Sequence, residues 1–382
     1  MGKKELDILT SSVVIIPAYE PPVSLVSLAD ELCRQYGCRV LVVNDGSGPF
    51  YDSIFEKLRA VSGCTVLTLS ENHGKGYALK TAFRWITRYH KSNNVVYITA
   101  DCDGQHAVKD IVRVAAAAAQ APGTLVLGTR DFSLSCVPRR SRFGNRAMSR
   151  LFRFLFGHKL NDTQTGLRAF DGTLLPLLLR ATGDGFDYET EVLIRCRESE
   201  IPIAEVHIET TYRSPEGTKQ KLSHFSPVAD SFRILSVFLR AVGPFILCAS
   251  LSAFVDISAF YFLSVFIPHP DSSFGLLIST VGARLLSSAV NLFLNGRYVF
   301  GRTVRNAWKR YYVLWGGRLL LSYGFTLTAG TFIKEVALLT AVKAVFDLFL
   351  SVLSFRLQKF WVFARNEKKI PPSIYKIFCG SY

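Results

Sequence analysis

The 382-residue sequence changes character near residue 243. Before that point short apolar runs alternate with polar segments, whereas long apolar runs dominate from Gly243 onward. The first pattern is typical of a sheet covered by helices, and the second of helices that cross a membrane. We therefore expect a cytosolic domain over residues 1–220, an interface segment over 221–242, a membrane domain over 243–365 and a basic cytosolic tail over 366–382.

The first half carries apolar segments that predict strands, at 13–18, 39–45, 64–70, 94–101 and 124–130. They are nearly continuous in Val, Ile and Leu, which is typical of parallel strands buried on both faces. Segments of helical length separate them, at 23–36, 50–61, 75–91 and 107–120. The alternation predicts an α/β fold with a doubly wound, mostly parallel sheet.

Polar side chains follow the predicted strands at their carboxyl ends, where doubly wound sheets bind their ligands. They are Tyr19 and Glu20, Asn44 and Asp45, Asn72, Asp101 and Asp103, and Arg130. The sequence has neither a GxGxxG turn after the first strand nor a P-loop. Carboxylate and amide oxygens suit Mg²⁺ or Mn²⁺, and such an ion neutralises a nucleotide diphosphate. Taken alone, an Asp-x-Asp pair is more often a solvated turn.

Several motifs occur in a fixed order along the chain: IPAYE, VVNDGSG, ENHGKGYALKTAF, ADCDGQH, LGTRDF and NDTQTGLRAF. Together they resemble glycosyltransferase family 2, which has the GT-A fold, and particularly its dolichyl- or polyprenyl-phosphate hexosyltransferase branch. The resemblance covers roughly residues 11–215. It implies a metal-dependent, inverting enzyme at the cytosolic membrane face. Such an enzyme moves a hexose of the mannose or glucose type from a nucleotide diphosphate sugar to polyprenyl or dolichyl phosphate.

The resemblance also implies roles for individual residues. The nucleotide sugar would be bound by Pro17, Ala18, Tyr19, Glu20, Asp45, Lys75 and Asp101. The metal, Mg²⁺ or Mn²⁺, would be held by Asp101, Asp103 and Gln105. Catalysis would rest on Asp101, Asp103 and Arg130. Glu20 and Lys75 could instead be solvated charges, and we expect His73 and His106 to make local polar contacts rather than to bind ligands.

Basic residues gather after the fifth predicted strand: Arg130, Arg139, Arg140, Arg142, Arg146, Arg150, Arg153 and Lys159. Apolar residues at helical spacing among them predict an amphipathic cationic helix, suited to an anionic membrane surface. A solvated helix face is the alternative, and the adjoining membrane domain argues against a nucleic-acid partner. By resemblance, Arg130 and Arg140 hold the acceptor phosphate, with Ser141 nearby.

A phosphate acceptor is already an anion at neutral pH, so the protein needs only to position it and to stabilise charge. We therefore assign no catalytic base. Asp162 and Asp187 could serve as bases for a hydroxyl acceptor, but we expect them to position the sugar or the active-site loop.

Long apolar segments follow at about 243–267, 274–294, 311–333 and 335–355. Each is close to the ~20 residues that a spanning helix needs. Lys and Arg are absent from the first predicted loop, 268–273, and frequent in the second loop and the tail. The positive-inside rule therefore predicts an integral, multi-pass protein with both termini cytosolic, in the plasma membrane if the protein is bacterial.

The apolar half contains an internal repeat: NLFLNGRYVF at 291–300 and SFRLQKFWVF at 354–363. The repeat predicts two related helical hairpins and resembles the GtrA-like four-helix membrane family over about 240–365. Ionisable residues lie inside the predicted spans: Asp256, Arg284, Arg318, Lys343 and Asp347. They form either a polar track for a lipid phosphate or internal contacts that hold the helices together. In the second case Asp256 would pair with Arg284 or Arg318, and Lys343 with Asp347 within one helix.

Other functions remain open at this point. One is a transporter or flippase of lipid-linked sugar that uses its transferase-like domain as a sensor. Another is a polysaccharide synthase with a hydroxyl acceptor, although the QxxRW motif usual in such synthases is absent from the sequence. The sequence is also compatible with a homo-oligomer.

Overall fold

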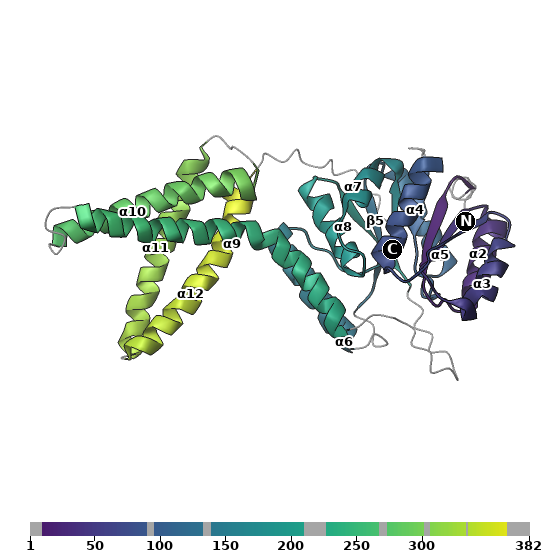
Figure 1. The fold of residues 1–382 in the computed structure, drawn as a ribbon, viewed down its shortest axis with the longest axis horizontal. Helices are drawn as coiled ribbons and strands as arrows, with labels where there is room; N and C mark the ends of the chain where they lie inside the picture. Colours follow the sequence, from purple (N-terminus) through teal and green to yellow (C-terminus); the bar gives the residue numbers. More distant parts are fainter. Residues whose placement is uncertain are drawn as a thin grey trace, which may run out of the picture. The chain divides into compact units, whose positions relative to one another are not determined.

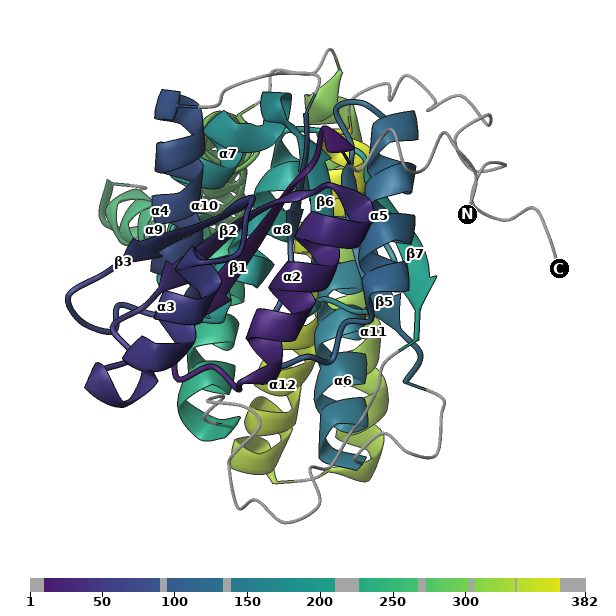
Figure 2. The same cartoon turned by 90° about the vertical axis from the view of Figure 1, so that its right-hand side faces the viewer.

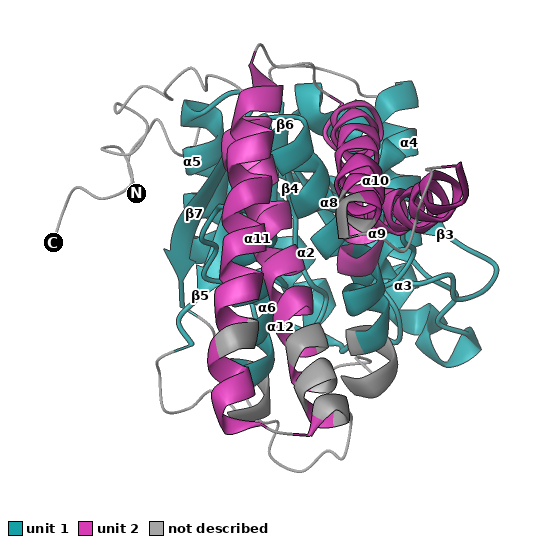
Figure 3. Ribbon diagram, turned by 90° about the vertical axis from the view of Figure 1, so that its left-hand side faces the viewer, with its two compact units in different colours: residues 1–237, 370–382 teal, residues 238–369 magenta. Residues whose placement is uncertain are grey.

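The computed structural model describes residues 10–89, 95–132, 139–209, 227–266, 273–301, 306–333 and 335–364 (Figure 1). The chain forms two compact units (Figure 3). The first runs to Val237 and the second begins at Phe238, inside helix α9 (Pro227–Phe266). The predicted division into a cytosolic domain, an interface segment, a membrane domain and a cytosolic tail stays a prediction.

The first unit contains a seven-stranded sheet in the order β3-β2-β1-β4-β6-β5-β7. Its strands are β1 (Val13–Ala18), β2 (Arg39–Asn44), β3 (Cys64–Thr68), β4 (Val96–Thr99), β5 (Leu125–Arg130), β6 (Arg168–Asp171) and β7 (Ile203–Ile208). All neighbours pair in parallel except β6, which is antiparallel to both β4 and β5. The predicted mostly parallel sheet is confirmed, and each of the predicted strands forms.

Strands β6 and β7 were not predicted. β6 has four residues, RAFD, and half of them are charged, so it has no apolar run. β7, IAEVHI, is mostly half-buried at the sheet edge and includes Glu205 and His207. Both strands are specified by their partners in the sheet, because pairing satisfies their backbone groups whatever the local hydrophobic pattern.

Helices cover both faces of the sheet (Figure 2). One layer contains α2 (Ser24–Tyr36), α3 (Asp52–Arg59) and α5 (Val108–Gln120), and the other contains α4 (Lys75–Tyr89), α7 (Leu175–Arg180) and α8 (Asp187–Glu198). Short 3-10 turns, η1 (Pro49–Tyr51) and η2 (Gly172–Leu174), precede α3 and α7. Alternate residues of β1 face opposite layers: Val14 and Ile16 pack in the core formed with α2, α3 and α5. Helix α6 (Arg139–Phe156) follows β5, where the basic helix was predicted.

The second unit is helical. It contains most of α9, then α10 (Ser273–Leu294), α11 (Ala307–Phe332) and α12 (Val336–Leu357), with π-helical turns η3 (Asn295–Val299) and η4 (Gln358–Val362) after α10 and α12. Each predicted apolar segment therefore lies in a helix. Within the described residues, the stretch Phe232–Phe266 is the one helix long and apolar enough to cross a membrane. The prediction that four helices cross a membrane stays a prediction.

The two halves of the internal repeat meet through equivalent residues. The Asn295 Nδ2 donates to the Gln358 Oε1 at 2.9 Å, and these residues are 63 positions apart, which is the offset of the repeat. Phe300 and Phe363, also equivalent, stack with their ring centroids 4.8 Å apart. Repeat-related residues thus form the buried contact between the hairpins.

The ionisable residues of this unit find partners on neighbouring helices. Asp256 pairs with Arg284 at 3.3 Å, as predicted, and also accepts a hydrogen bond from Ser287. Arg318 donates to Ser351, and Asp347 accepts from Ser322. The Lys343 side chain, predicted to pair with Asp347, lies outside the described residues.

Candidate active site

Polar residues meet at one edge of the sheet because β1, β2 and β4 run in parallel. The Asp45 amide donates to the Ala18 carbonyl at 2.9 Å, and the Ala100 amide donates to the Ile15 carbonyl at 3.0 Å. These bonds continue the strand pairing past the strand ends. The residues that follow the strands therefore share one edge: Tyr19 and Glu20 after β1, Asp45 after β2, and Asp101 and Asp103 after β4. This is the predicted ligand edge.

Lys75, the first residue of α4, lies between two carboxylates. Its Nζ is 2.6 Å from the Asp101 Oδ1 and 2.6 Å from the Glu189 Oε1. The side chains of Lys75 and Glu189 are 16% and 4% exposed, so the pairing is largely shielded from water. Burial alone lowers the pKa of Lys75, but the charges of Asp101 and Glu189 outweigh it and hold the pKa above its usual value. Lys75 is therefore a fixed cation of this site.

The Asp101 carboxylate is surrounded on three sides. Its Oδ2 is 3.3 Å from the Nε2 of the buried His106, and its Oδ1 binds Lys75. Gly166 lies against the same carboxylate, and its carbonyl accepts a hydrogen bond from the Thr99 hydroxyl at 2.8 Å. Burial raises the pKa of Asp101, but Lys75 and His106 outweigh it and hold the pKa well below its usual value. Asp101 is therefore ionised and held in one orientation.

His106 lies just before helix α5 but does not cap it. Helix α5 begins at Val108, and its N-terminus has no side-chain cap. The His106 ring instead contacts Asp101, and its buried Nδ1 has no hydrogen-bond partner among the described residues. The expectation that His106 makes a local polar contact is met, with a carboxylate of the site as the partner.

Asp45 holds the loop that leads to Lys75. Its Oδ1 accepts from the His73 amide and its Oδ2 from the Gly74 amide, both at 2.9 Å. Gly74 has φ +97°, and a Cβ there would lie 2.5 Å from the Asp184 carbonyl oxygen, so only glycine fits. Because both Asp45 oxygens accept hydrogen bonds from the loop, the carboxylate positions Lys75 indirectly, through the loop backbone.

The residues predicted to line the nucleotide pocket occupy the end of β1 and the turn after it. Pro17 and Ala18 are buried in the strand, whereas Tyr19 and Glu20 are half-buried beyond it. Glu20 has φ +49°, and its amide donates to the Ser47 hydroxyl at 3.0 Å. Ser47 in turn donates its own amide to the Asn44 side chain at 2.9 Å. The β2 turn therefore sets the conformation of Glu20.

Asp103 is the most suitable metal ligand of the cluster. Its Oδ1 accepts from the Gln105 amide at 3.0 Å, and no Lys or Arg of the described residues forms an ion pair with it. Burial, followed by the charge of Asp101, raises the pKa of Asp103. A divalent cation would relieve this unfavourable burial, so the residues fit the predicted Mg²⁺ or Mn²⁺. Gln105 contacts Asp103 through its backbone amide. Among the described residues, no group of three His, Cys, Asp or Glu side chains is already arranged to hold a metal ion.

Arg130, predicted to bind the acceptor phosphate, pairs with Asp162. The Nε donates to Oδ2 at 2.7 Å and the Nη2 to Oδ1 at 3.1 Å, a two-pronged contact with a carboxylate that is fully buried. Its guanidinium also lies 5.1 Å from the centre of the Phe132 ring. Asp162 therefore orients Arg130. Arg140 and Ser141 are in α6, but their side chains lie outside the described residues.

Glu189 also belongs to this cluster, although it was not predicted from the sequence. It lies in the segment DYETE, in which the sequence suggested a role for Asp187 instead. The Asp187 Oδ1 accepts a hydrogen bond from the Gly185 amide at 3.1 Å. Glu189 is 114 positions from Lys75, so no local spacing indicates the pair. Its place in the first turn of α8 was the available signal, because carboxylates are favoured there.

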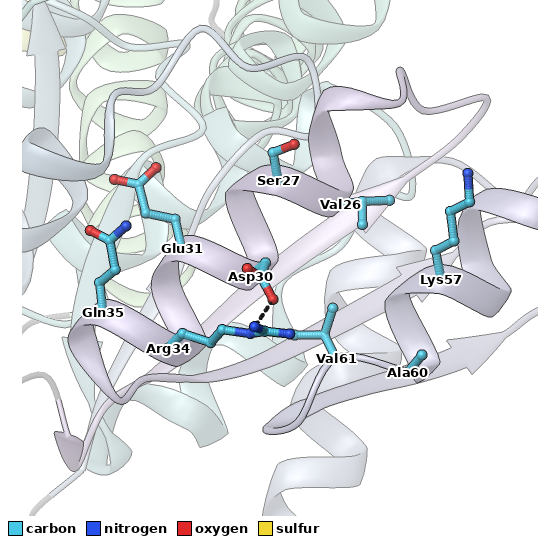
Figure 4. Close-up of a pocket in the computed structure, with 9 residues that line it drawn as sticks. All are labelled: Val26, Ser27, Asp30, Glu31, Arg34, Gln35, Lys57, Ala60 and Val61. Atoms are coloured by element: carbon cyan, nitrogen blue, oxygen red, sulfur yellow. Dashed lines mark ion pairs between the residues drawn. The ribbon is translucent and has the colours of Figure 1, made fainter.

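A separate surface pocket between α2 and α3 shares no residue with this cluster (Figure 4). It is lined by Val26, Ser27, Asp30, Glu31, Arg34, Gln35, Lys57, Ala60 and Val61. An ion pair at 2.6 Å joins Asp30 and Arg34 inside it. The strand-end cluster, where charged side chains from distant elements converge, is the better candidate for the active site.

Two relatives are similar to the first part of the chain. A UDP-N-acetylglucosamine–dolichyl-phosphate N-acetylglucosaminyltransferase of Methanococcus voltae is 28% identical over 218 residues, which cover 52% of this chain and 85% of that protein. The glycosyltransferase AglJ of Haloferax volcanii is 26% identical over 231 residues, which cover 60% of this chain and 71% of that protein.

A solved structure is also similar. It is the glucosyl-3-phosphoglycerate synthase of Mycobacterium tuberculosis in complex with Mn²⁺, uridine diphosphate and phosphoglyceric acid. The TM-score is 0.46 at 16% identity, with 63% of this chain and 83% of that chain covered.

A sequence model of glycosyl transferase family 2 matches residues 13–173. The matched segment includes β1 to β6 and the residues Asp101, Asp103, Lys75 and Arg130. The predicted resemblance to family 2 is confirmed for this segment. The hexosyltransferase branch and the resemblance of the second unit to the GtrA-like family stay predictions. Residues 13–173 of the chain are therefore similar to glycosyl transferase family 2.

Proposed function

We propose that this protein transfers a hexose or N-acetylhexosamine from a nucleoside diphosphate sugar to polyprenyl or dolichyl phosphate, with a divalent cation, at the cytosolic face of a membrane. The observation that carries the proposal is the cluster of Asp101, Asp103 and Lys75 at the ligand edge of a family 2 domain. A relative named for transfer to dolichyl phosphate supports the acceptor class.

The donor would bind across the ends of β1, β2 and β4. Tyr19 and Glu20 would contact the base and ribose, and Lys75 would offset the charge of the diphosphate near Asp101. Asp103, with Asp101 and the Gln105 side chain, would hold Mg²⁺ or Mn²⁺. When bound, the ion would stabilise the negative charge of the departing nucleoside diphosphate.

The acceptor phosphate would attack the anomeric carbon without help from a base. In support, the carboxylates that could serve as bases are already engaged. Asp162 binds Arg130 through both oxygens, Asp187 accepts from the Gly185 amide, and Glu189 binds Lys75. A phosphate needs positioning and charge stabilisation instead, which guanidinium groups supply. We assign that role to Arg130, held in place by Asp162, and to Arg140 with Ser141 nearby.

Helix α6 would lie against the membrane surface that carries the acceptor. Arg146, Arg150 and Arg153 are exposed, and Phe143 on the same helix is 76% exposed. The helix has six arginines and no acidic residue. Cationic side chains beside an exposed aromatic ring suit an anionic lipid surface. The four apolar helices of the second unit would anchor the protein as a multi-pass membrane domain, with both termini cytosolic.

A direct assay tests this function. Purified full-length protein is incubated with Mn²⁺, a panel of labelled nucleotide sugars and polyprenyl phosphate. We expect a chloroform-extractable, acid-labile product with at least one donor, and no product from the Asp103→Asn variant. Label in an acid-stable polymer would instead favour a hydroxyl acceptor. Absence of product with every donor would contradict the proposal and favour a transport role.

A further inference from the structure

Glu189 is a buried carboxylate whose charge the proposed reaction does not use directly. It lies in the first turn of α8, 4% exposed, and its Oε1 accepts from the Lys75 Nζ at 2.6 Å. Its backbone carbonyl accepts from the Arg168 Nη1 at 2.9 Å. A carboxylate is seldom buried unless its charge is compensated, and Lys75 supplies the compensating charge here.

The loop geometry brings Lys75 and Glu189 together closely. Gly76 lies against Tyr188, the neighbour of Glu189, and a Cβ at position 76 would come within 2.6 Å of the Tyr188 Cβ. The Lys75 ammonium also lies 5.7 Å from the centre of the Phe186 ring, and Phe186 directly precedes the first residue of α8. The start of α4 and the start of α8 therefore form one rigid contact around the Lys75 side chain.

Lys75 is shared equally between its two carboxylates, at 2.6 Å from each. If Glu189 carried no charge, Lys75 would neutralise Asp101 alone. An Asp101 carboxylate neutralised in this way would attract a cation less strongly, because electrostatic interactions are strong at short range in a site shielded from water. With Glu189 present, the group of Lys75, Asp101 and Glu189 keeps one net negative charge beside Asp103.

We infer that Glu189 is a positioning residue of the transferase site: by sharing Lys75 with Asp101, it preserves the negative charge with which Asp101 and Asp103 attract a divalent cation. The inference deepens the proposed function and rests on its divalent cation. Glu189 does not touch the cation in this scheme. It acts through Lys75, and its charge, rather than its shape, is the property that matters.

The experiment measures Mn²⁺ binding to the full-length protein without nucleotide, from the free Mn²⁺ signal in electron paramagnetic resonance. Glu189→Gln keeps the shape and the hydrogen bond but removes the charge, and we expect its Kd for Mn²⁺ to rise at least tenfold. Lys75→Met/Glu189→Gln removes both charges and restores the net charge of the wild type. We expect its Kd to lie within about threefold of the wild type or below it.

Glu191→Gln is the matched control. Glu191 lies on the same helix and pairs with Arg195 at 2.8 Å, away from Lys75. We expect it to bind Mn²⁺ like the wild type. Unchanged Mn²⁺ binding in Glu189→Gln would overturn the inference, and so would a double variant as weak as Glu189→Gln, because a structural defect would then explain both.

The outcomes for the inference and for the proposed function are separable. Product formation by the wild type with normal Mn²⁺ binding in Glu189→Gln refutes the inference alone. Mn²⁺ binding that follows the expected pattern without any lipid-linked product refutes the acceptor assignment alone. A wild type that binds no Mn²⁺ refutes the inference together with the metal role, while the product assay in EDTA still tests the acceptor.

Discussion

Gly166 lies so close to the Asp101 carboxylate that a Cβ at position 166 would come within 2.3 Å of Oδ1 and 2.5 Å of Oδ2. The contact joins the loop before β6 to the end of β4, and the Thr99 hydroxyl fixes it by donating to the Gly166 carbonyl. Asp101 can therefore lie beside Lys75 only because residue 166 is a glycine and has no side chain.

Gly166→Ala should displace the Asp101 carboxylate and lower transferase turnover at least tenfold, because misplacement of about 1 Å costs about 10² in rate. The measurement is the rate of product formation at saturating donor. Gly144→Ala is the control: a Cβ at that position in α6 meets nothing within 4 Å, so turnover should be retained. Full activity of Gly166→Ala would show that the place of Asp101 is not critical.

Asp103→Asn should abolish metal-dependent turnover while leaving the fold intact. The substitution removes the carboxylate that no Lys or Arg of the described residues pairs with, and it leaves the hydrogen bond from the Gln105 amide possible. Because burial raises the pKa of Asp103, loss of the charge should not lower the thermal midpoint. Persistent Mn²⁺-stimulated turnover would contradict the metal assignment.

Arg130→Ala should destabilise the first unit, because it leaves the fully buried Asp162 without its cation. Breaking a buried pair costs about 3 kcal/mol, which corresponds to roughly 6–12 °C in the thermal midpoint of a domain of this size. The measurement is thermal unfolding in detergent. Arg130→Ala/Asp162→Asn should recover part of the loss, since the remaining group is then neutral. A double variant no more stable than Arg130→Ala would contradict the pairing.

The Lys75–Asp101 pair predicts a defined pH dependence of stability. The pKa of Asp101 is held below its unfolded value, so its stabilisation is present above about pH 4 and is lost as the pH falls further. The pKa of Lys75 is raised, so its contribution is present below about pH 10 and is lost as the pH rises through the folded value. The stability difference between wild type and Lys75→Met should therefore be large at pH 7 and smaller at pH 3. A constant difference in thermal midpoint would contradict this pair.

Cys102, between the two aspartates, should be chemically inert. Burial, followed by the charges of Asp103 and Asp101, raises the pKa of the Cys102 thiol to about 12. The thiolate, which is the reactive form, then makes up about one part in ten thousand at pH 8. Iodoacetamide at pH 8 should leave Cys102 unmodified in peptide mass spectra, and Cys102→Ala should keep at least half of the activity. Rapid alkylation of the native protein would contradict the buried environment.

The sequence by itself determined the regular elements of the protein and the edge at which its site lies. Apolar runs such as 13–18 and 39–45 predict buried parallel strands, because a strand covered on both faces must be apolar throughout. The carboxyl ends of parallel strands share one edge, so the order of strands and polar residues along the chain is enough to group Asp45, Asp101 and Asp103. The apolar segments of the second half predicted helices by length alone.

The tertiary structure decided which charges meet. Glu189 reaches Lys75 across 114 positions, Asp162 reaches Arg130 across 32, and Gly166 packs on Asp101 from the loop before an antiparallel strand that no pattern indicated. The physical reason is that periodicity records only whether a residue is buried. The partner of a buried charge depends on which distant element supplies the opposite charge, and this is fixed only when the chain has folded.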